Sequence, residues 1–283
     1  MDGFLDIILL YYSSLSLLVN QYMLISIITS TYNEYQTGEL KLAIASVLQQ
    51  TYKHWEMIII GDCTPYGEKI ERLIAELNDA RVQFFNMGKR SGLESPGTIP
   101  KIKGISLARG ELLAFLDSDN EYFPDHLARS LEAFVKNPSL DLVYGDTLVK
   151  ISNVKYQMSN LCAFIWRKPE WNEKAATMLE RINFLDMSEP VFRKEAYIAA
   201  GGLSSTHHAS DWFLWRAMIR AGRGRFLHIN HRGLIYKTHS LLHHLSYYIL
   251  MLGVKSDMPY RSLKLAWMQK HIQKRFQKKY GKS

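Results

Sequence analysis

The chain has 283 residues, of which 47% are hydrophobic and 22% charged, and its formal net charge is +8. These values are ordinary for a globular protein, and no repeat or low-complexity tract is visible. The two cysteines, Cys63 and Cys162, lie far apart and lack metal-ligand spacing. This pattern argues against a disulfide framework and a structural zinc site, and it is compatible with the cytoplasmic location that we expect.

The N-terminal segment, residues 1–22, is mostly apolar. Its run from Phe4 to Val19 includes Asp6 and three serines, and it is shorter than the ~20 residues that a membrane-spanning helix needs. It also lacks the basic start and the small-residue cleavage site of a signal peptide. We therefore expect an apolar helix that packs on the domain, on a partner or on a membrane surface.

From Leu24 to Tyr144, strand-like and helix-like segments alternate. The predicted strands are residues 24–29, 55–60, 82–85, 112–116 and 140–144, and the predicted helices are residues 40–48, 70–77, 99–108 and 127–135. The strands are short apolar runs, whereas the helices carry apolar side chains on one face. This order predicts an α/β, Rossmann-like fold, in which helices flank a mostly parallel sheet with right-handed crossovers.

The order is less regular after Tyr144. Strands are predicted at residues 146–151, 191–192, 225–229 and 233–238, and helices at residues 194–200 and 211–221. Residues 152–187 are aromatic, basic and irregular. No linker separates the two halves, so we expect one domain with an insertion rather than two domains.

The C-terminal extension, residues 241–283, is predicted to be helical and basic. From Lys264 to Lys282 it holds seven lysine or arginine residues and no acid, and Leu263 and Trp267 fall at helical spacing. A basic amphipathic helix can lie on an anionic membrane, and the alternative is a solvated helix. No nucleic-acid-binding module accompanies these residues, so we expect no nucleic acid partner.

The most informative motif follows the predicted strand at residues 112–116. Five apolar residues run directly into Asp117 and Asp119, which places both carboxylates at the end of a strand where open α/β sheets bind ligands. Two carboxyl groups this close repel each other when both are ionised, unless a cation or hydrogen bonds compensate their charges. Hard oxygen ligands suit a Mg²⁺ or Mn²⁺ ion that carries a phosphate. The alternative is a turn that caps the helix after Pro124.

Two other predicted strands also end in polar residues. The first is followed by Ser30, Thr31, Tyr32 and Asn33, and the second by Asp62. The carboxyl ends of parallel strands meet at one edge of a sheet, so these side chains are expected to join the acids after the fourth strand. Such a set predicts a nucleotide pocket.

An ordered set of motifs resembles that of family 2 glycosyltransferases. The motifs are residues 29–34 (TSTYNE), 46–52 (SVLQQTY), 55–62 (WEMIIIGD), 108–111 (ARGE), 115–119 (FLDSD), 193–202 and 211–216 (DWFLWR). The resemblance covers about residues 24–239. It implies a GT-A fold for residues 23–240, with a nucleotide-binding part at 23–145 and an acceptor part at 146–240.

The resemblance implies inverting transfer of a sugar from a nucleotide diphosphate donor, with UDP suggested by the acid that meets the base. By this likeness, Asp62 accepts a hydrogen bond from the base, Tyr32 stacks on or flanks the base, and Ser30 contacts the nucleotide near it. Lys101 offsets the charge of the diphosphate. Asp117 touches the ribose or supports the metal shell.

The resemblance also implies a divalent ion, Mg²⁺ or Mn²⁺, that bridges the two phosphates. Asp119 is similar to the family acid that binds this ion. His239 sits where some members have a residue near the diphosphate or the metal, and a neutral imidazole can ligate the ion. The alternative for His239 is an exposed loop position.

Asp211 matches the catalytic base of the family, which removes the proton of the acceptor hydroxyl. It opens a helix rich in aromatic residues, and Trp212, Phe213 and Trp215 are expected to form a floor for the acceptor. The alternative is that Asp211 is the N-cap of this helix.

Together these features favour a metal-dependent glycosyltransferase that acts on a polysaccharide or a lipid-linked glycan, with peripheral contact to a membrane. The alternative is a catalytically silent, nucleotide-sugar-binding subunit of a glycan assembly complex, which the joint presence of Asp62, Asp119 and Asp211 disfavours. A nucleotidyltransferase would need a Gly-rich triphosphate loop, and residues 31–34 are not one. Residues 152–187 are expected to shape acceptor choice.

Overall fold

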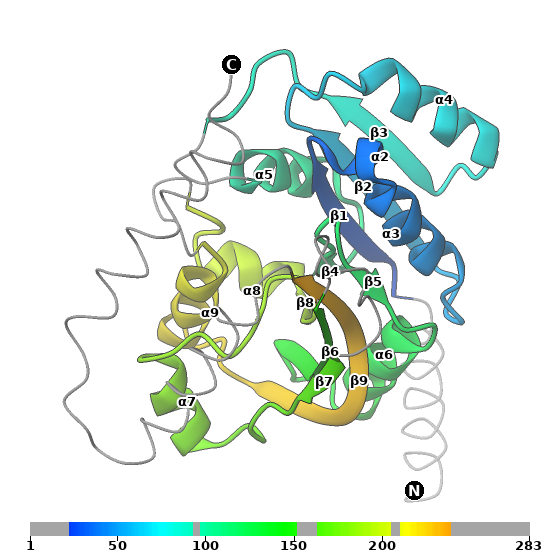
Figure 1. The fold of residues 1–283 in the computed structure, drawn as a ribbon. Coiled ribbons are helices and arrows are strands. Elements are labelled where there is room, and N and C mark those ends of the chain that lie inside the picture. Colours follow the sequence, from blue (N-terminus) through cyan, green and yellow to red (C-terminus); the bar gives the residue numbers. More distant parts are fainter. Residues whose placement is uncertain (1–22, 93–96, 152–162, 205–209, 239–283) are drawn as a thin grey trace, which may run out of the picture.

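The computed structural model describes residues 23–92, 97–151, 163–204 and 210–238 (Figure 1). Within these ranges, no helix combines the length and the apolar character that crossing a membrane requires. The predicted helices at residues 1–22 and 241–283 lie outside the described residues, and so does His239.

A nine-stranded sheet forms the centre of the described part of the chain. Its strands are β1 (Ile25–Thr31), β2 (Trp55–Gly61), β3 (Val82–Asn86), β4 (Leu112–Phe115), β5 (Glu121–Tyr122), β6 (Leu142–Ile151), β7 (Ala163–Trp166), β8 (Val191–Arg193) and β9 (Phe226–Thr238). The order across the sheet is β3-β2-β1-β4-β8-β6-β9-β5, and β7 pairs with β6.

The first half of the sheet is parallel, as predicted. β1 pairs in parallel with both β2 and β4, and β2 pairs in parallel with β3. The residues that follow these strands therefore leave the sheet at the same edge, which is the geometry that a shared pocket needs. β4 pairs antiparallel with β8, and this pair joins the first half of the sheet to the second.

The second half differs from the prediction in its strand boundaries. The sequence predicts two strands within residues 140–151 and two within 225–238, but the structure has one long strand in each place, β6 and β9. These strands pair in parallel, with register shifts around Asp146. A Cβ at Gly145 would overlap the carbonyl oxygen of His231. The glycines and polar residues that suggested breaks are thus accommodated as irregularities within paired strands.

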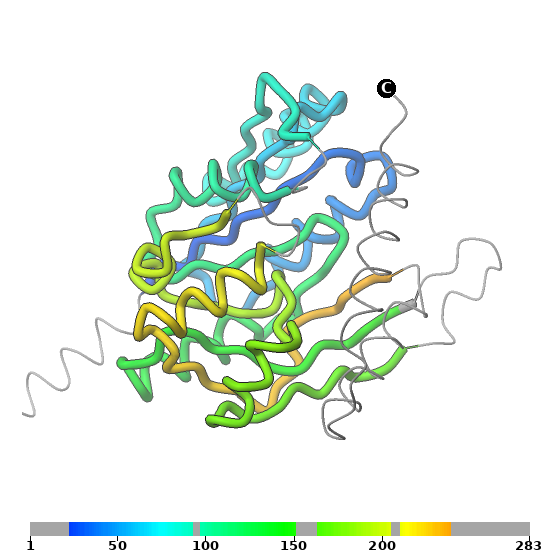
Figure 2. Tube along the Cα trace, turned by 90° about the vertical axis from the view of Figure 1, so that its left-hand side faces the viewer, coloured from blue at the N-terminus to red at the C-terminus, as the bar shows by residue number. Residues whose placement is uncertain are grey.

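Helices cover both faces of the sheet, and the turned view shows the blue and cyan N-terminal half above the green-to-orange half (Figure 2). On one face lie α2 (Glu34–Thr37), α3 (Glu39–Leu48), α4 (Gly67–Leu77) and α6 (His126–Lys136). On the other face lie α5 (Thr98–Leu107), α7 (Glu173–Leu179), α8 (Lys194–Ala199) and α9 (Ser210–Arg220).

Side chains of the central strands alternate between these two helical layers. Ile25 and Ile27 of β1 pack in the core with α3, α4 and α6, whereas Ile28 packs in the core with α5, α8 and α9. Because both faces are covered, nearly every position of β1, β2 and β4 is buried. This explains why these strands are continuous apolar runs in the sequence.

Candidate active site

Three elements bring polar side chains together at the carboxyl edge of the parallel strands. The ammonium of Lys101, on α5, lies 2.7 Å from Oδ1 of Asp117, which follows β4. It also donates a hydrogen bond of 3.2 Å to Oγ of Ser30 in β1. The side chain of Lys101 is 6% exposed and that of Asp117 is 36% exposed. Three predicted nucleotide-binding residues therefore share one cluster, with its carboxylate open to solvent.

Two glycines let α5 approach β1 closely enough to build this cluster. A Cβ at Gly97, where φ is +76°, would lie 2.8 Å from Oγ of Ser30 and 3.2 Å from Nζ of Lys101. A Cβ at Gly104 would lie 2.5 Å from Cγ2 of Ile28. Lys101 reaches the strand ends because the helix that carries it lies directly against β1.

The two residues predicted to contact the base lie at the same edge. Asp62 follows β2, and its N–H donates to the carbonyl of Thr31 at 2.9 Å. Its Oδ1 accepts the N–H of Ser91 at 2.8 Å, and its Oδ2 accepts the Ser91 hydroxyl at 2.7 Å. The guanidinium of Arg90 lies 3.9 Å from the ring centroid of Tyr32. A carboxylate oxygen that accepts one bond has a further lone pair for a ligand.

The turn after β4 carries the candidate metal ligands. The N–H of Asn120 donates to the carbonyl of Asp117 at 2.9 Å, and Asp119 is partly exposed. Among the described residues there is no group of three or more side chains able to cage a metal ion. Proteins usually hold Mg²⁺ with one or two carboxylates, and substrate phosphates and water complete the shell. Asp117 and Asp119 therefore fit an ion that arrives with a diphosphate.

Asp211, the predicted base, lies within the first turn of α9 rather than at the capping position before it. Its Oδ2 accepts from Nδ2 of Asn183 at 2.9 Å, and its Oδ1 accepts the N–H of Trp212 at 2.7 Å. Burial raises the pKa of Asp211 to about 6, against the effect of these two hydrogen bonds, and the charges of Asp186 and Asp117 add to the rise. Such a carboxylate is a stronger base than an ordinary surface aspartate.

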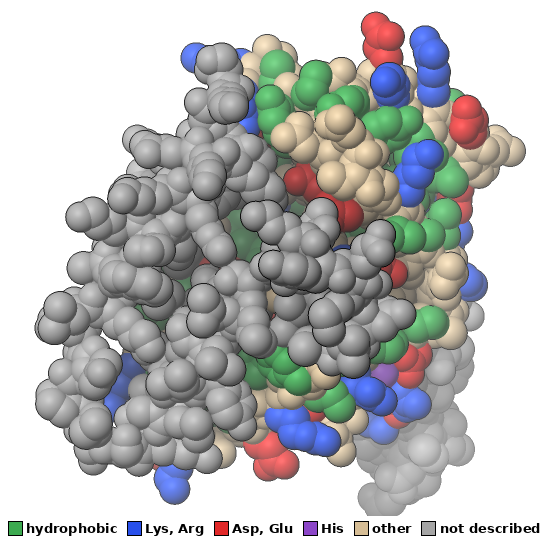
Figure 3. Space-filling model, viewed as in Figure 1, with side chains coloured by type: hydrophobic (Ala, Val, Ile, Leu, Met, Phe, Trp, Pro, Cys, Tyr) green, Lys and Arg blue, Asp and Glu red, His purple; other side chains and the backbone are tan. Residues whose placement is uncertain are grey.

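Asp211 lies close to the nucleotide cluster. The charge of Asp117 acts on its carboxyl group, and the hydroxyls of Thr98 and Ser210, 3.0 Å apart, join the first turns of α5 and α9. The space-filling view, from the same side as Figure 1, shows acidic side chains in the upper middle of the molecule (Figure 3). The structure thus brings the predicted base and the strand-end cluster into one region.

One expectation for α9 is wrong. Trp215 is fully buried, and its ring lies edge-on to Phe192 with centroids 5.4 Å apart, so it cannot form a floor for an acceptor. Trp212 and Phe213 are at least partly exposed, and the Arg216 guanidinium lies 5.0 and 5.8 Å from their ring centroids. The helical period separates the buried ring from the exposed ones.

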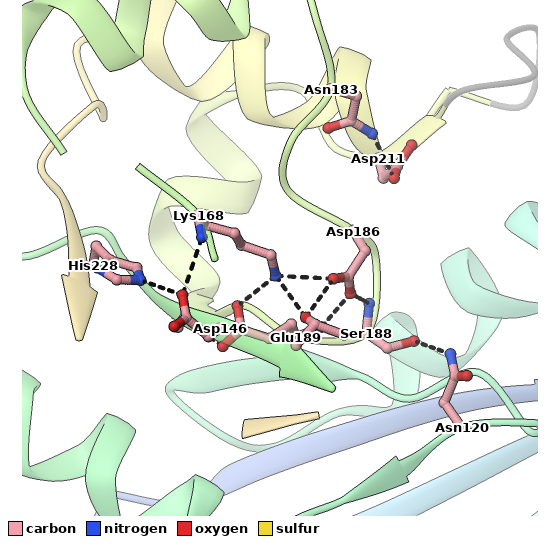
Figure 4. A network of polar contacts seen from close by, with 11 residues as sticks. Asn120, Asp146, Lys168, Asn183, Asp186, Ser188, Glu189, Asp211 and His228 are labelled. Carbon is pink, nitrogen blue, oxygen red and sulfur yellow. Dashed lines mark hydrogen bonds and ion pairs between the residues drawn. The ribbon is translucent and has the colours of Figure 1, made fainter. Parts of the chain in front are cut away.

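The sequence did not predict the residues that contact Asp117 and Asp211 or hold these contacts in place. They are Lys168, Asn183, Asp186, Ser188 and Glu189 (Figure 4). A signal was present, because several of them directly precede β8. Since β8 runs antiparallel to β4, the residues before β8 lie at the same edge of the sheet as the residues after β4.

With this geometry in view, comparison with known proteins identifies the family. The family described as Glycosyl transferase family 2 matches residues 26–199. The chain belongs to this family. The matched range includes Ser30, Asp62, Lys101 and Asp117 and ends before Asp211.

Curated relatives in glycan biosynthesis match this family 2 chain over shorter stretches. WcaA of Escherichia coli K12, named for glycosyl transfer in colanic acid biosynthesis, is 36% identical over 105 residues, which are 37% of this chain and 36% of that protein. TuaG of Bacillus subtilis, named for teichuronic acid biosynthesis, is 34% identical over 109 residues, or 38% and 41% of the two chains. WfgD of Escherichia coli, a UDP-Glc:α-D-GlcNAc-diphosphoundecaprenol β-1,3-glucosyltransferase by name, is 28% identical over 123 residues, or 44% and 45%. The chain therefore matches less than half the length of each.

Solved structures share the fold. Staphylococcus aureus TarS 1–349 in complex with UDP-GlcNAc superposes with a TM-score of 0.56 and 18% identity, over 79% of this chain and 61% of that one. The mannosyltransferase PcManGT from Pyrobaculum calidifontis, in complex with GDP-Man and Mn²⁺, has a TM-score of 0.53 and 14% identity, over 80% and 59%. These likenesses confirm the predicted GT-A fold.

Proposed function

We propose that the protein is an inverting glycosyltransferase that moves a sugar from a UDP-sugar to a hydroxyl of a glycan or lipid-linked acceptor, assisted by Mg²⁺ or Mn²⁺. One observation carries the proposal. The Lys101–Asp117 pair, with its 2.7 Å contact, and the carboxylate of Asp211, whose pKa is raised by burial, lie in one region, because the 3.0 Å contact between Thr98 and Ser210 joins the first turns of α5 and α9. Glycosyl transfer needs groups that stabilise the negative charge of the leaving diphosphate and a base that takes the proton of the acceptor hydroxyl.

The donor side rests on hydrogen bonding and charge. Asp62 offers a carboxylate to the ring N–H of uracil, and Tyr32 flanks the base. The Lys101 ammonium offsets the charge of the diphosphate. Asp117 and Asp119 would hold the divalent ion, which when bound stabilises the negative charge that grows on the leaving diphosphate.

The acceptor side requires one proton transfer and one displacement. The acceptor oxygen forms a bond to the anomeric carbon while the bond from that carbon to the diphosphate oxygen breaks, and its electron pair leaves with UDP. Asp211 takes the proton of the acceptor hydroxyl. Attack from the face opposite the diphosphate inverts the anomeric configuration. A positioned base of this kind contributes about 10²–10⁴-fold to the rate.

The names of related proteins favour this class of substrates. WfgD is named for a UDP-Glc donor and a diphosphoundecaprenol-linked acceptor, and TarS was solved with UDP-GlcNAc. PcManGT was solved with Mn²⁺. We extend the UDP-sugar donor, the lipid-linked acceptor and the divalent ion to this chain, and we assign it to polysaccharide biosynthesis. A lipid-linked acceptor would place the protein at the cytoplasmic face of a membrane.

The proposal is tested by measuring release of the nucleoside diphosphate from a panel of UDP- and GDP-sugars. Each donor is assayed with Mn²⁺ or with a chelator, and with or without a lipid-linked glycan fraction as acceptor. We expect one UDP-sugar to be consumed, faster with Mn²⁺ and faster with acceptor. Metal-independent binding of UDP without turnover of any donor would contradict the proposal and favour the silent binding subunit.

A further inference from the structure

Residues 182–190, called here the linking segment, contact both halves of the candidate site. Near one end, Asn183 donates to Asp211 at 2.9 Å. Near the other end, Oγ of Ser188 accepts the N–H of Asp117 at 3.0 Å. The linking segment is neither helix nor strand, so side chains have to hold its shape.

The side chain of Lys168, which lies outside the linking segment in the sequence, contacts the middle of it (Figure 4). Its ammonium lies 2.9 Å from Oδ2 of Asp186 and 3.5 Å from Oε2 of Glu189, and it donates to Oγ1 of Thr147 at 2.9 Å. The side chain of Lys168 is 0% exposed. An ammonium group has three protons and meets three acceptors here, which is the condition for burying a cation without an unpaired donor.

The carboxylates that Lys168 binds hold backbone groups in turn. Oδ1 of Asp186 accepts the N–H groups of Ser188, at 2.9 Å, and of Glu189, at 2.8 Å. Oε1 of Glu189 accepts the N–H of Gly145 in β6. The position of Ser188, and with it the contact to the turn after β4, therefore depends on where Lys168 holds Asp186.

The charges of Asp186 and Glu189 explain why a lysine can be buried at position 168. Burial alone would lower the pKa of the Lys168 ammonium, but Asp186 and Glu189 raise it above its ordinary value, so the group stays charged. One cation faces two carboxyl groups, and burial raises the pKa of Glu189, the more buried of the two, while the nearby Lys168 ammonium lowers it. Without the ammonium, two buried acids would lie side by side with no counter-ion. This arrangement would strongly destabilise the packing of the linking segment.

We propose that Lys168 is a positioning residue for the active site. By holding Asp186 and Glu189 it fixes the linking segment, which in turn sets the Asp211 carboxylate and the Asp117–Asn120 turn relative to each other. Its consequence for catalysis rests on the proposed function, whereas the mechanical coupling does not.

The first test measures amide hydrogen exchange in Lys168→Met, which keeps the length of the side chain and removes its charge. The matched control is Lys194→Met, because the Lys194 ammonium donates at 2.6 Å to the carbonyl of Ala108, before the start of β4. We expect Lys168→Met to speed exchange about tenfold or more in both residues 116–120 and the linking segment, and the control in neither. Unchanged exchange in residues 116–120 would overturn the inference.

The second test measures UDP affinity in Mn²⁺ and turnover. We expect Lys168→Met to lower UDP affinity and turnover by about tenfold each. Lys168→Arg, which keeps the positive charge, should show smaller losses of both. Adding Ser188→Ala to Lys168→Met should cost little more UDP affinity, because both changes break the same chain of contacts. A Lys168→Met protein that unfolds at lower temperature but keeps native affinity and turnover below it would overturn the inference.

Two further outcomes keep the tests separate. If Lys168→Met does not fold, Thr147→Val takes its place in the same exchange measurement. It leaves all charges in place and removes the hydroxyl that accepts from the Lys168 ammonium and donates to Oδ2 of Asp186 at 3.2 Å. A separate outcome is that the unmodified protein turns over no donor while Lys168→Met still speeds exchange in both residues 116–120 and the linking segment. In that case the proposed function fails and the positioning role of Lys168 stands.

Discussion

At the scale of single residues, Asp211, the proposed base, shows how its surroundings can make an aspartate more basic. Burial and the nearby charges of Asp186 and Asp117 raise its pKa to about 6, and hydrogen bonds from Asn183 and Trp212 keep the pKa from rising further. The group is therefore ionised at neutral pH and still gains basicity. Both parts of this balance can be changed by mutation.

Replacing the base should separate chemistry from binding. We expect Asp211→Asn to leave UDP affinity within about twofold of the parent and to lower turnover by about two orders of magnitude or more. Asp79→Asn, which alters an ion pair with Arg81 outside the site, is the control and should leave both quantities unchanged. Calorimetric titration and UDP release measure them, and a parallel loss of UDP affinity in Asp211→Asn would refute its role as base.

The pH dependence follows from the same carboxylate. Turnover should rise with pH through about 6, where Asp211 loses its proton. Asn183 donates to the ionised carboxylate, so Asn183→Leu removes stabilisation of the charged form, raises the pKa of Asp211 and moves this acidic limb to higher pH. The measurement is kcat at saturating donor between about pH 5 and pH 8. A limb that does not move would assign the titration to another group.

At the scale of elements, the contact between α5 and β1 links stability to the nucleotide cluster. A Cβ at Gly104 would lie 2.5 Å from Cγ2 of Ile28, so Gly104→Ala should push α5 away from the sheet. We expect a loss of about 1–3 kcal/mol in the free energy of unfolding, together with weaker UDP binding through displaced Lys101. Gly88→Ala, with no atom within 4 Å of the new methyl group, is the control. Equal stabilities of the two variants in denaturant unfolding would contradict this account.

The same scale explains which parts the sequence could predict. β1, β2 and β4 are covered on both faces, so their apolar runs were visible, and Asp117 stood out because it directly follows such a run. The boundaries within β6 and β9 depend on pairing between distant segments, which local pattern does not contain. The local sequence pattern did not single out Lys168, because its partners lie 18 and 21 residues away in an irregular stretch. The orientation of Trp215 required the packing of α9 on β8.

At the scale of the whole molecule, the candidate site needs both halves of the sheet. The parallel half carries the predicted nucleotide residues, and the second half carries Asp211 on α9. The antiparallel β4–β8 pair and the linking segment are two of the places where these halves meet. On the proposed function, a donor bound at the strand ends would lie beside Asp211 only while the linking segment keeps its shape.

The central claim is that the acids after the strands form one pocket for a nucleoside diphosphate with its divalent ion. Calorimetric titration of UDP into the parent and into Asp119→Ala, each with Mn²⁺ or with a chelator, tests it most directly. We predict that Mn²⁺ strengthens UDP binding to the parent by about tenfold or more and leaves Asp119→Ala nearly unaffected. If the variant binds UDP and responds to Mn²⁺ as the parent does, the claim is wrong.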